Sequence, residues 1–153
     1  MDHSQEAVRL FYEGYNCSQA VFCAFRDLTG LELDCAARLA SPFGGGMGRL
    51  REVCGTMSGA LLALGILKGY DNPENPEAKK EHYALVREFA RRFEEKYGAL
   101  RCKELLKDVP VTPGGEPEAR TPEFYKRRPC LKLVEGAAAI LDDMLEEMKE
   151  EAE

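Results

Sequence analysis

The chain has 153 residues, of which 44% are hydrophobic and 31% charged, and its net charge at pH 7 is −6. This balance predicts one globular domain, 1–153, with enough residues to bury a core. The short, separated basic clusters ARR and YKRR argue against a nucleic-acid partner. The longest apolar run, Ala60 to Leu67, is too short to span a bilayer, and no apolar signal segment follows Met1. We therefore expect a cytoplasmic protein with no membrane partner.

Helical periodicity dominates the sequence, and no strand pattern, internal repeat or domain linker is convincing. In chain order, the first expected helix is capped by Ser4 and ends at Gly14, the second runs from Cys17 to Gly30, and a short third one at 35–40 is capped by Asp34. An apolar helix follows after Met57, and the next helix ends at Gly98. The remaining expected elements are a short helix in LRCKELLKD, one helical turn at TPEFY, and a last helix that starts at Pro129. The helix after Met57 is apolar nearly all round, which is typical of a central helix. The expected fold class is all-α, a multi-helix bundle around this glycine-containing helix.

Six cysteines stand out: Cys17, Cys23, Cys35, Cys54, Cys102 and Cys130. In a cytoplasmic protein we expect them to stay reduced rather than to form three disulfides. The sequence contains no C-x-x-C and no C-x-x-C-H, so a zinc ribbon, a thioredoxin-like site and a covalent c-type haem all lack their local signature. A shared cysteine site would have to be assembled from distant parts of the chain.

Four of the cysteines are expected at or near helix starts: Cys17, Cys54, Cys102 and Cys130. Asn16 is a preferred N-cap and Gln19 completes a capping box, so Cys17 takes the first position of its helix. The positive end of a helix dipole favours a thiolate, and we therefore expect a lowered pKa for Cys17. Cys23 lies in mid-helix, about 240° around the axis from Cys17, and cannot bond to it. For any single cysteine, structural burial is the alternative interpretation.

A glycine-rich segment, FGGGMG, precedes Cys54. It is no P-loop, because no Lys-Ser/Thr pair follows, and the full G-x-G-x-x-G pattern is absent. We favour a tight turn that allows close backbone approach; in the alternative, Gly44, Gly45 and Gly46 cradle a cofactor or cluster. The two histidines, His3 and His82, are too few for a His-rich metal site, and His3 is expected near a mobile terminus.

The segment from Val109 to Pro129 is rich in proline and glycine and links two of the four cysteines. Long segments of this kind in compact domains are usually functional or disordered. We expect this one to cover the cysteine site and to limit its access to solvent.

Several blocks of the sequence, taken together, resemble a known family. GYNCSQAV, FGGGMGRLREVCGTMSGALLALG, RCKEL and CLKLVEGAAAIL are similar to the redox-active proteins labelled C_GCAxxG_C_C, from Gly14 to about Leu141. The four spaced cysteines of that label fall on Cys17, Cys54, Cys102 and Cys130. Where the label has Gly-Cys-Ala-x-x-Gly, this chain reads VCGTMSG. Cys23 and Cys35 match no labelled position and are expected to be structural.

The resemblance implies redox activity based on cysteines. The family is also similar to the non-haem part of the split-Soret cytochromes, which implies electron transfer and an iron–sulfur cluster. Without C-x-x-C-H, this chain should carry no covalent haem.

Two classes of function follow. In the leading hypothesis, the four labelled cysteines either hold an iron–sulfur cluster or other thiolate-bound metal or cycle between dithiol and disulfide, with Cys17 as the attacking thiolate. In the alternative, the chain is a helical protein-interaction module with structural cysteines. The redox partner is not identified by the sequence, and a homodimer is compatible with a glycine-lined helix.

Overall fold

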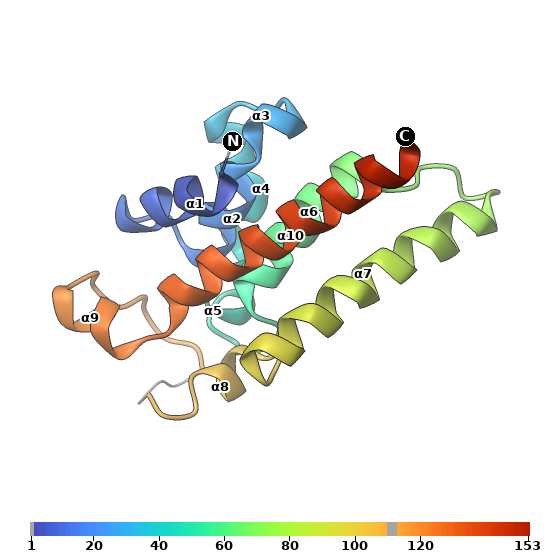
Figure 1. The fold of residues 1–153 in the computed structure, drawn as a ribbon. Coiled ribbons are helices and arrows are strands. Elements are labelled where there is room, and N and C mark those ends of the chain that lie inside the picture. The colour runs from blue at the N-terminus through green and yellow to red at the C-terminus, as the bar shows by residue number, and fades with distance from the viewer. Residues whose placement is uncertain (1, 110–112) are drawn as a thin grey trace.

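The fold is built from helices (Figure 1). The computed structural model describes residues 2–109 and 113–153, and in these ranges there is no β-strand, only an isolated antiparallel bridge between Val53 and Arg101. The elements are α1 (His3–Tyr12), α2 (Cys17–Ala24), α3 (Arg26–Thr29), α4 (Leu33–Ala40), a 3₁₀ turn (Ser41–Phe43), α5 (Gly44–Met47), α6 (Gly55–Lys68), α7 (Pro76–Tyr97), α8 (Cys102–Leu105), α9 (Pro122–Arg127) and α10 (Cys130–Ala152). The all-α expectation is confirmed. Within the described ranges, every helix is too short or too polar to cross a bilayer.

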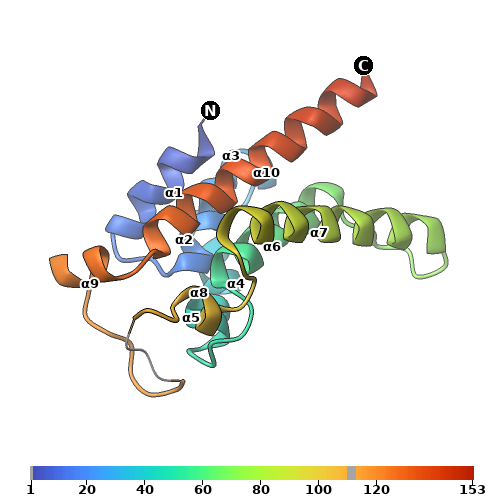
Figure 2. The same ribbon diagram turned by 60° about the horizontal axis from the view of Figure 1, so that its bottom comes forward.

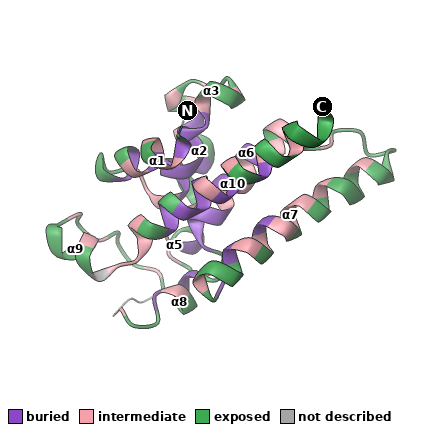
Figure 3. Ribbon diagram, in the orientation of Figure 1, coloured by how far each residue is buried: buried purple, intermediate pink, exposed green. Residues whose placement is uncertain are grey.

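The core lies where α1, α2, α6 and α10 meet (Figure 3). Helix α2 is buried over nearly its whole length and packs against α1, α4, α6 and α10. Helix α7 runs beside α10, to which it is joined by an Arg92–Glu147 ion pair of 2.6 Å, and it buries Phe89 and Phe93. The short helices α5 and α8 lie together at one end of the core, and α9 lies beyond the start of α10 (Figure 2).

Several expected helix boundaries need correction. The first helix is capped by Asp2, whose side chain accepts from the Ser4 backbone N–H, and not by Ser4 itself. The helix expected from Cys17 to Gly30 is broken at Phe25, whose ring is fully buried, into α2 and α3. Burial of that ring in the core outweighs the local preference for a continuous helix.

The N-terminus also differs from expectation. His3 is only 5% exposed and lies between two carboxylates, with Nδ1 2.6 Å from Asp142 of α10 and Nε2 2.9 Å from Asp27 of α3. Its ring stacks on Phe25 at a centroid distance of 4.2 Å. These contacts fix the start of α1 to two other helices.

Close packing of α2 on α6 depends on two glycines of α6. A Cβ atom at Gly59 would overlap with the carbonyl oxygen of Ser18, and one at Gly55 would lie 2.5 Å from Cys17 Sγ. The backbone that lies against these glycines is the first turn of α2. Gly65, in the same helix, faces open space.

This contrast gives a matched pair of substitutions. Gly59→Ala should lower the free energy of unfolding by about 1–3 kcal/mol, because the new methyl group forces α2 and α6 apart. Gly65→Ala should raise the free energy of unfolding by about 0.5–1 kcal/mol, because alanine is favoured over glycine inside a helix. Urea unfolding followed by far-UV circular dichroism measures both. Equal effects of the two substitutions would contradict this packing.

Candidate functional site

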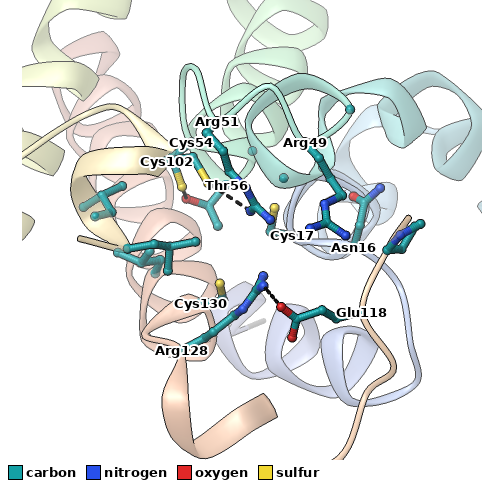
Figure 4. Close-up of a pocket in the computed structure, with 18 of the residues that line it drawn as sticks. Asn16, Cys17, Arg49, Arg51, Cys54, Thr56, Cys102, Glu118, Arg128 and Cys130 are labelled. Atoms are coloured by element: carbon teal, nitrogen blue, oxygen red, sulfur yellow. Dashed lines mark hydrogen bonds and ion pairs between the residues drawn. The ribbon is translucent and has the colours of Figure 1, made fainter. Parts of the chain in front are cut away.

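One cavity of about 290 Å³ is lined by Cys17, Cys54, Cys102 and Cys130 (Figure 4). Each of these residues stands at a helix start. Cys17, Cys102 and Cys130 are the first residues of α2, α8 and α10, and Cys54 is the N-cap of α6. Four segments that are distant in the sequence therefore present their positive helix ends, and a thiol each, to one space.

The cap expected for α2 is present in full. The Asn16 side chain accepts from the Gln19 N–H at 2.9 Å, and the Gln19 side chain accepts from the Asn16 N–H at 3.0 Å. This capping box fixes Cys17 at the first helical position.

The other two cysteines are elsewhere. Cys23 is buried in the core and Cys35 is partly exposed on α4, and neither lines the cavity. All six thiols are free, so no disulfide joins any pair.

The glycine-rich segment forms one wall of the site. Gly44 and Gly45 line the cavity, and the backbone of Gly45 forms a hydrogen bond with the Cys17 thiol. A Cβ atom at Gly46 would lie 2.7 Å from Cβ of Cys102. The segment is therefore a tight turn that brings backbone against the cysteines, which is the interpretation favoured from the sequence.

Four arginines that the sequence analysis did not single out also line the cavity: Arg49, Arg51, Arg120 and Arg128. Arg51 is 2% exposed and donates to Cys102 Sγ at 3.5 Å. Arg49 and Arg51 both have positive φ, 69° and 61°, which is unfavourable for a residue with a Cβ atom. No spacing in the sequence marks these arginines; the only signal is that two follow the glycine-rich turn and one lies two residues before Cys130.

The thiols interact with one another electrostatically. Burial raises the pKa of Cys17 and of Cys54, and it raises the pKa of Cys130 to about 12; a charge on a neighbouring cavity thiol raises each of these pKa values further. For Cys17, hydrogen bonds from the backbone of Gly45 and Ser18 act in the opposite direction but do not outweigh burial. The expectation of a lowered pKa at Cys17 is therefore wrong. Its helix start is correct, but its thiol lines the cavity, where desolvation outweighs the helix start.

The side chains do not form a ready-made site for a single ion. Over residues 2–109 and 113–153, no three His, Cys, Asp or Glu side chains are grouped closely enough to hold one metal ion. Within the site, the Cys54 sulfur contacts Thr56 Oγ1 at 3.1 Å. The four thiols thus surround a shared space without meeting at one point.

Residues 113–121 of the segment that was expected to cover the site form part of the cavity wall. Gly115, Pro117, Glu118 and Arg120 all contribute to the lining, and the helix expected at TPEFY is α9. Arg120 fixes the segment in place, because it donates to the carbonyl oxygens of Phe11 and Tyr15 at 2.9 and 2.8 Å. Its guanidinium also lies 4.2 Å from the centre of the Phe11 ring. The rest of the expected segment, 110–112, lies outside the described residues.

Reactivity of the thiols should reflect this burial. In reduced, folded, metal-free protein, iodoacetamide should label Cys35, which lies outside the cavity, before Cys17 near neutral pH, because only the thiolate is alkylated and the raised pKa keeps Cys17 protonated. The rate at Cys17 should keep rising above about pH 8.5, the ordinary pKa of a thiol. Peptide mass spectrometry over a pH series measures both rates. Preferential labelling of Cys17 at mildly acidic pH would contradict the raised pKa.

The cover should loosen when its anchor is removed. Arg120→Gln takes away the cation that holds 113–121 against α1, so subtilisin should cut this segment several-fold faster than in the unaltered protein. Lys126→Gln, which changes an exposed side chain of neighbouring α9, is the control and should leave the rate unchanged. Equal cleavage of the two variants would mean that Arg120 does not anchor the segment.

One family of known proteins is similar to most of this chain. A family model described as "Putative redox-active protein (C_GCAxxG_C_C)" matches residues 15–144, which is most of the chain. No curated protein and no solved structure matches. The resemblance noted in the sequence is confirmed, and the chain belongs to the C_GCAxxG_C_C family.

Proposed function

We propose that this protein is a cytoplasmic electron-transfer protein in which an iron–sulfur cluster, or another thiolate-bound metal centre, is held by Cys17, Cys54, Cys102 and Cys130. One observation carries the proposal: thiols from four separate helix starts line a single cavity, while the two remaining cysteines do not. Six free cysteines also suit a reducing compartment.

The residues present fit such a centre. Four thiolates are the usual ligand set of an iron–sulfur cluster. A cluster of several atoms separates its ligands more widely than one ion does, which suits thiols that surround a space without meeting at a point. Gly46 and Gly55 lack the Cβ atoms that would press on Cys102 and Cys17. When bound, the cluster would supply one-electron chemistry.

The chain's own groups have definite roles around that centre. Arg51 donates to Cys102 Sγ, and the backbone of Gly45 forms a hydrogen bond with the thiol of Cys17. Hydrogen bonds to the sulfurs and low solvent exposure are what tune the potential of a thiolate-bound centre. The segment 113–121 would exclude water from it.

Thiol–disulfide chemistry at the same cavity is the second candidate. It is favoured by the fact that all four cavity cysteines are free and line one space. A disulfide requires Cα atoms about 4.4–6.8 Å apart. The two candidates use the same residues but differ in metal content.

Purification without oxygen, followed by assay of iron and acid-labile sulfide and by visible absorption, separates the candidates. We expect coloured protein with stoichiometric iron and sulfide. Cys102→Ser should lose most of the colour, because the soft thiolate is removed from a ligand position. Cys35→Ser, a change outside the cavity, should retain the full content.

Three other results have distinct meanings. Metal-free protein with thiols that oxidise reversibly in pairs supports the dithiol candidate. Metal-free protein without redox-active thiols supports the interaction module and contradicts the proposal. Equal loss of iron in Cys102→Ser and Cys35→Ser would also contradict it, since the cavity would then not be the binding site.

A further inference from the structure

The cavity carries a strong excess of positive charge. Among the described residues that line it are four arginines, Arg49, Arg51, Arg120 and Arg128, but one carboxylate, that of Glu118. Three helices of eight residues or more, α2, α6 and α10, also begin at this cavity. Helix starts and guanidinium groups both favour anions.

The arginines differ in how far their donors are already used. Arg120 is committed to the carbonyl oxygens of Phe11 and Tyr15. Arg128 has a side chain that is 8% exposed and reaches Glu118 with Nη2 at 2.6 Å, which leaves its buried Nε–H without a partner among the described residues. The buried Nε–H of Arg49 is also without a described partner. A buried donor with no acceptor is costly and therefore uncommon.

The geometry directs these groups to one place. Figure 4 shows Arg49 and Arg51 reaching the cavity from one side and Arg128 reaching it from the other, next to Cys130. Arg49 and Arg51 both have positive φ, in the turn that brings them to the cavity.

We propose that the arginine side of this cavity binds a small, multiply charged oxyanion of the size of phosphate or sulfate, next to the cysteines. Such an anion supplies acceptors for the unpartnered Nε–H groups of Arg49 and Arg128 and balances the charge of the guanidinium groups. The cavity, at about 290 Å³, has room for an ion of this size beside the sulfurs. This inference deepens the proposed function and rests on it in one respect, namely that the anion site adjoins the metal centre held by the four cysteines.

Isothermal titration calorimetry of the anoxically purified protein tests the proposal, with inorganic phosphate and sulfate as probes and acetate as the singly charged comparison. We expect saturable binding of phosphate or sulfate, tighter than that of acetate. Arg128→Gln and Arg49→Gln should each weaken the binding at least tenfold. Arg87→Gln, an exposed position on α7, is the matched control and should bind as the unaltered protein does.

A second measurement places the anion beside the thiols. In reduced, metal-free protein, saturating phosphate should slow iodoacetamide labelling of the cavity cysteines several-fold and leave labelling of Cys35 unchanged. If Arg128→Gln fails to fold because its ion pair with Glu118 is lost, Arg49→Gln and the labelling experiment still decide the matter. Absence of binding, binding unaffected by Arg49→Gln, or equal protection of Cys35 and the cavity cysteines would overturn the inference.

Iron and sulfide assays on the same samples keep the two proposals separate. Protein that contains the metal centre but binds neither phosphate nor sulfate overturns the anion site and leaves the redox proposal standing. Protein that binds phosphate through Arg49 and Arg128 but has no metal and no redox-active thiols supports the anion site and overturns the redox proposal.

Discussion

Contact between the first turn of α2 and the glycine face of α6 determines where the rest of the site can lie. Without a Cβ atom at Gly59, the two backbones approach until the Ser18 carbonyl rests against α6. The same approach brings Cys17 Sγ against Gly55, immediately after Cys54. Helix α10 then packs on both α2 and α6, and this packing places Cys130 on a third side of the cavity. The cavity is therefore a consequence of helix packing and not of a local motif.

Within that cavity, two electrostatic effects compete at Cys17, and their magnitudes decide the outcome. A helix start favours a nearby negative charge by about 0.3–1 kcal/mol at an exposed site. Burial can raise the pKa of an acidic group by up to about 3–5 pH units, and each pH unit corresponds to about 1.36 kcal/mol. Desolvation is the stronger effect, so a helix start alone does not make this enclosed cysteine a thiolate. Any positively charged group that binds among the sulfurs would change that balance.

Local patterns in the sequence were sufficient for much of the fold. The Asn16–Gln19 capping box, the stop at Gly98 and the proline before the last helix depend on neighbouring residues, and the elements that they mark are present. The helix expected to be capped by Asp34 instead begins at Leu33, with Glu32 as its N-cap. The break at Phe25 was missed because it depends on the core into which the ring is buried. His3 was misplaced for the same reason, since Asp27 and Asp142 are its neighbours only after folding.

In the candidate site, too, features set by neighbouring residues could be predicted, whereas features set by contacts between distant segments could not. The positions of four cysteines at helix starts could be predicted, because caps and glycines mark those starts. Their common cavity was suggested by the family resemblance and not by spacing. The four cavity arginines could not be predicted from the sequence, because an arginine is ordinarily a surface residue. Nothing near Arg128 in the sequence indicates that its side chain is nine-tenths buried.

Assembly of the cavity from four distant helix starts also restricts when it can form during synthesis. Cys130 is the first residue of the last helix, α10. Contacts of α10 with α2 and α6 bring together segments separated by most of the chain, and contacts of this kind form more slowly than a local helix does. A ribosome adds about 5–20 residues per second, so a nascent chain carries three of these thiols for several seconds before α10 emerges. During that interval Cys17, Cys54 and Cys102 lack the cavity wall that α10 provides. The incomplete site therefore depends on a reducing compartment, rather than on the fold, to protect its thiols from oxidation and from premature metal binding.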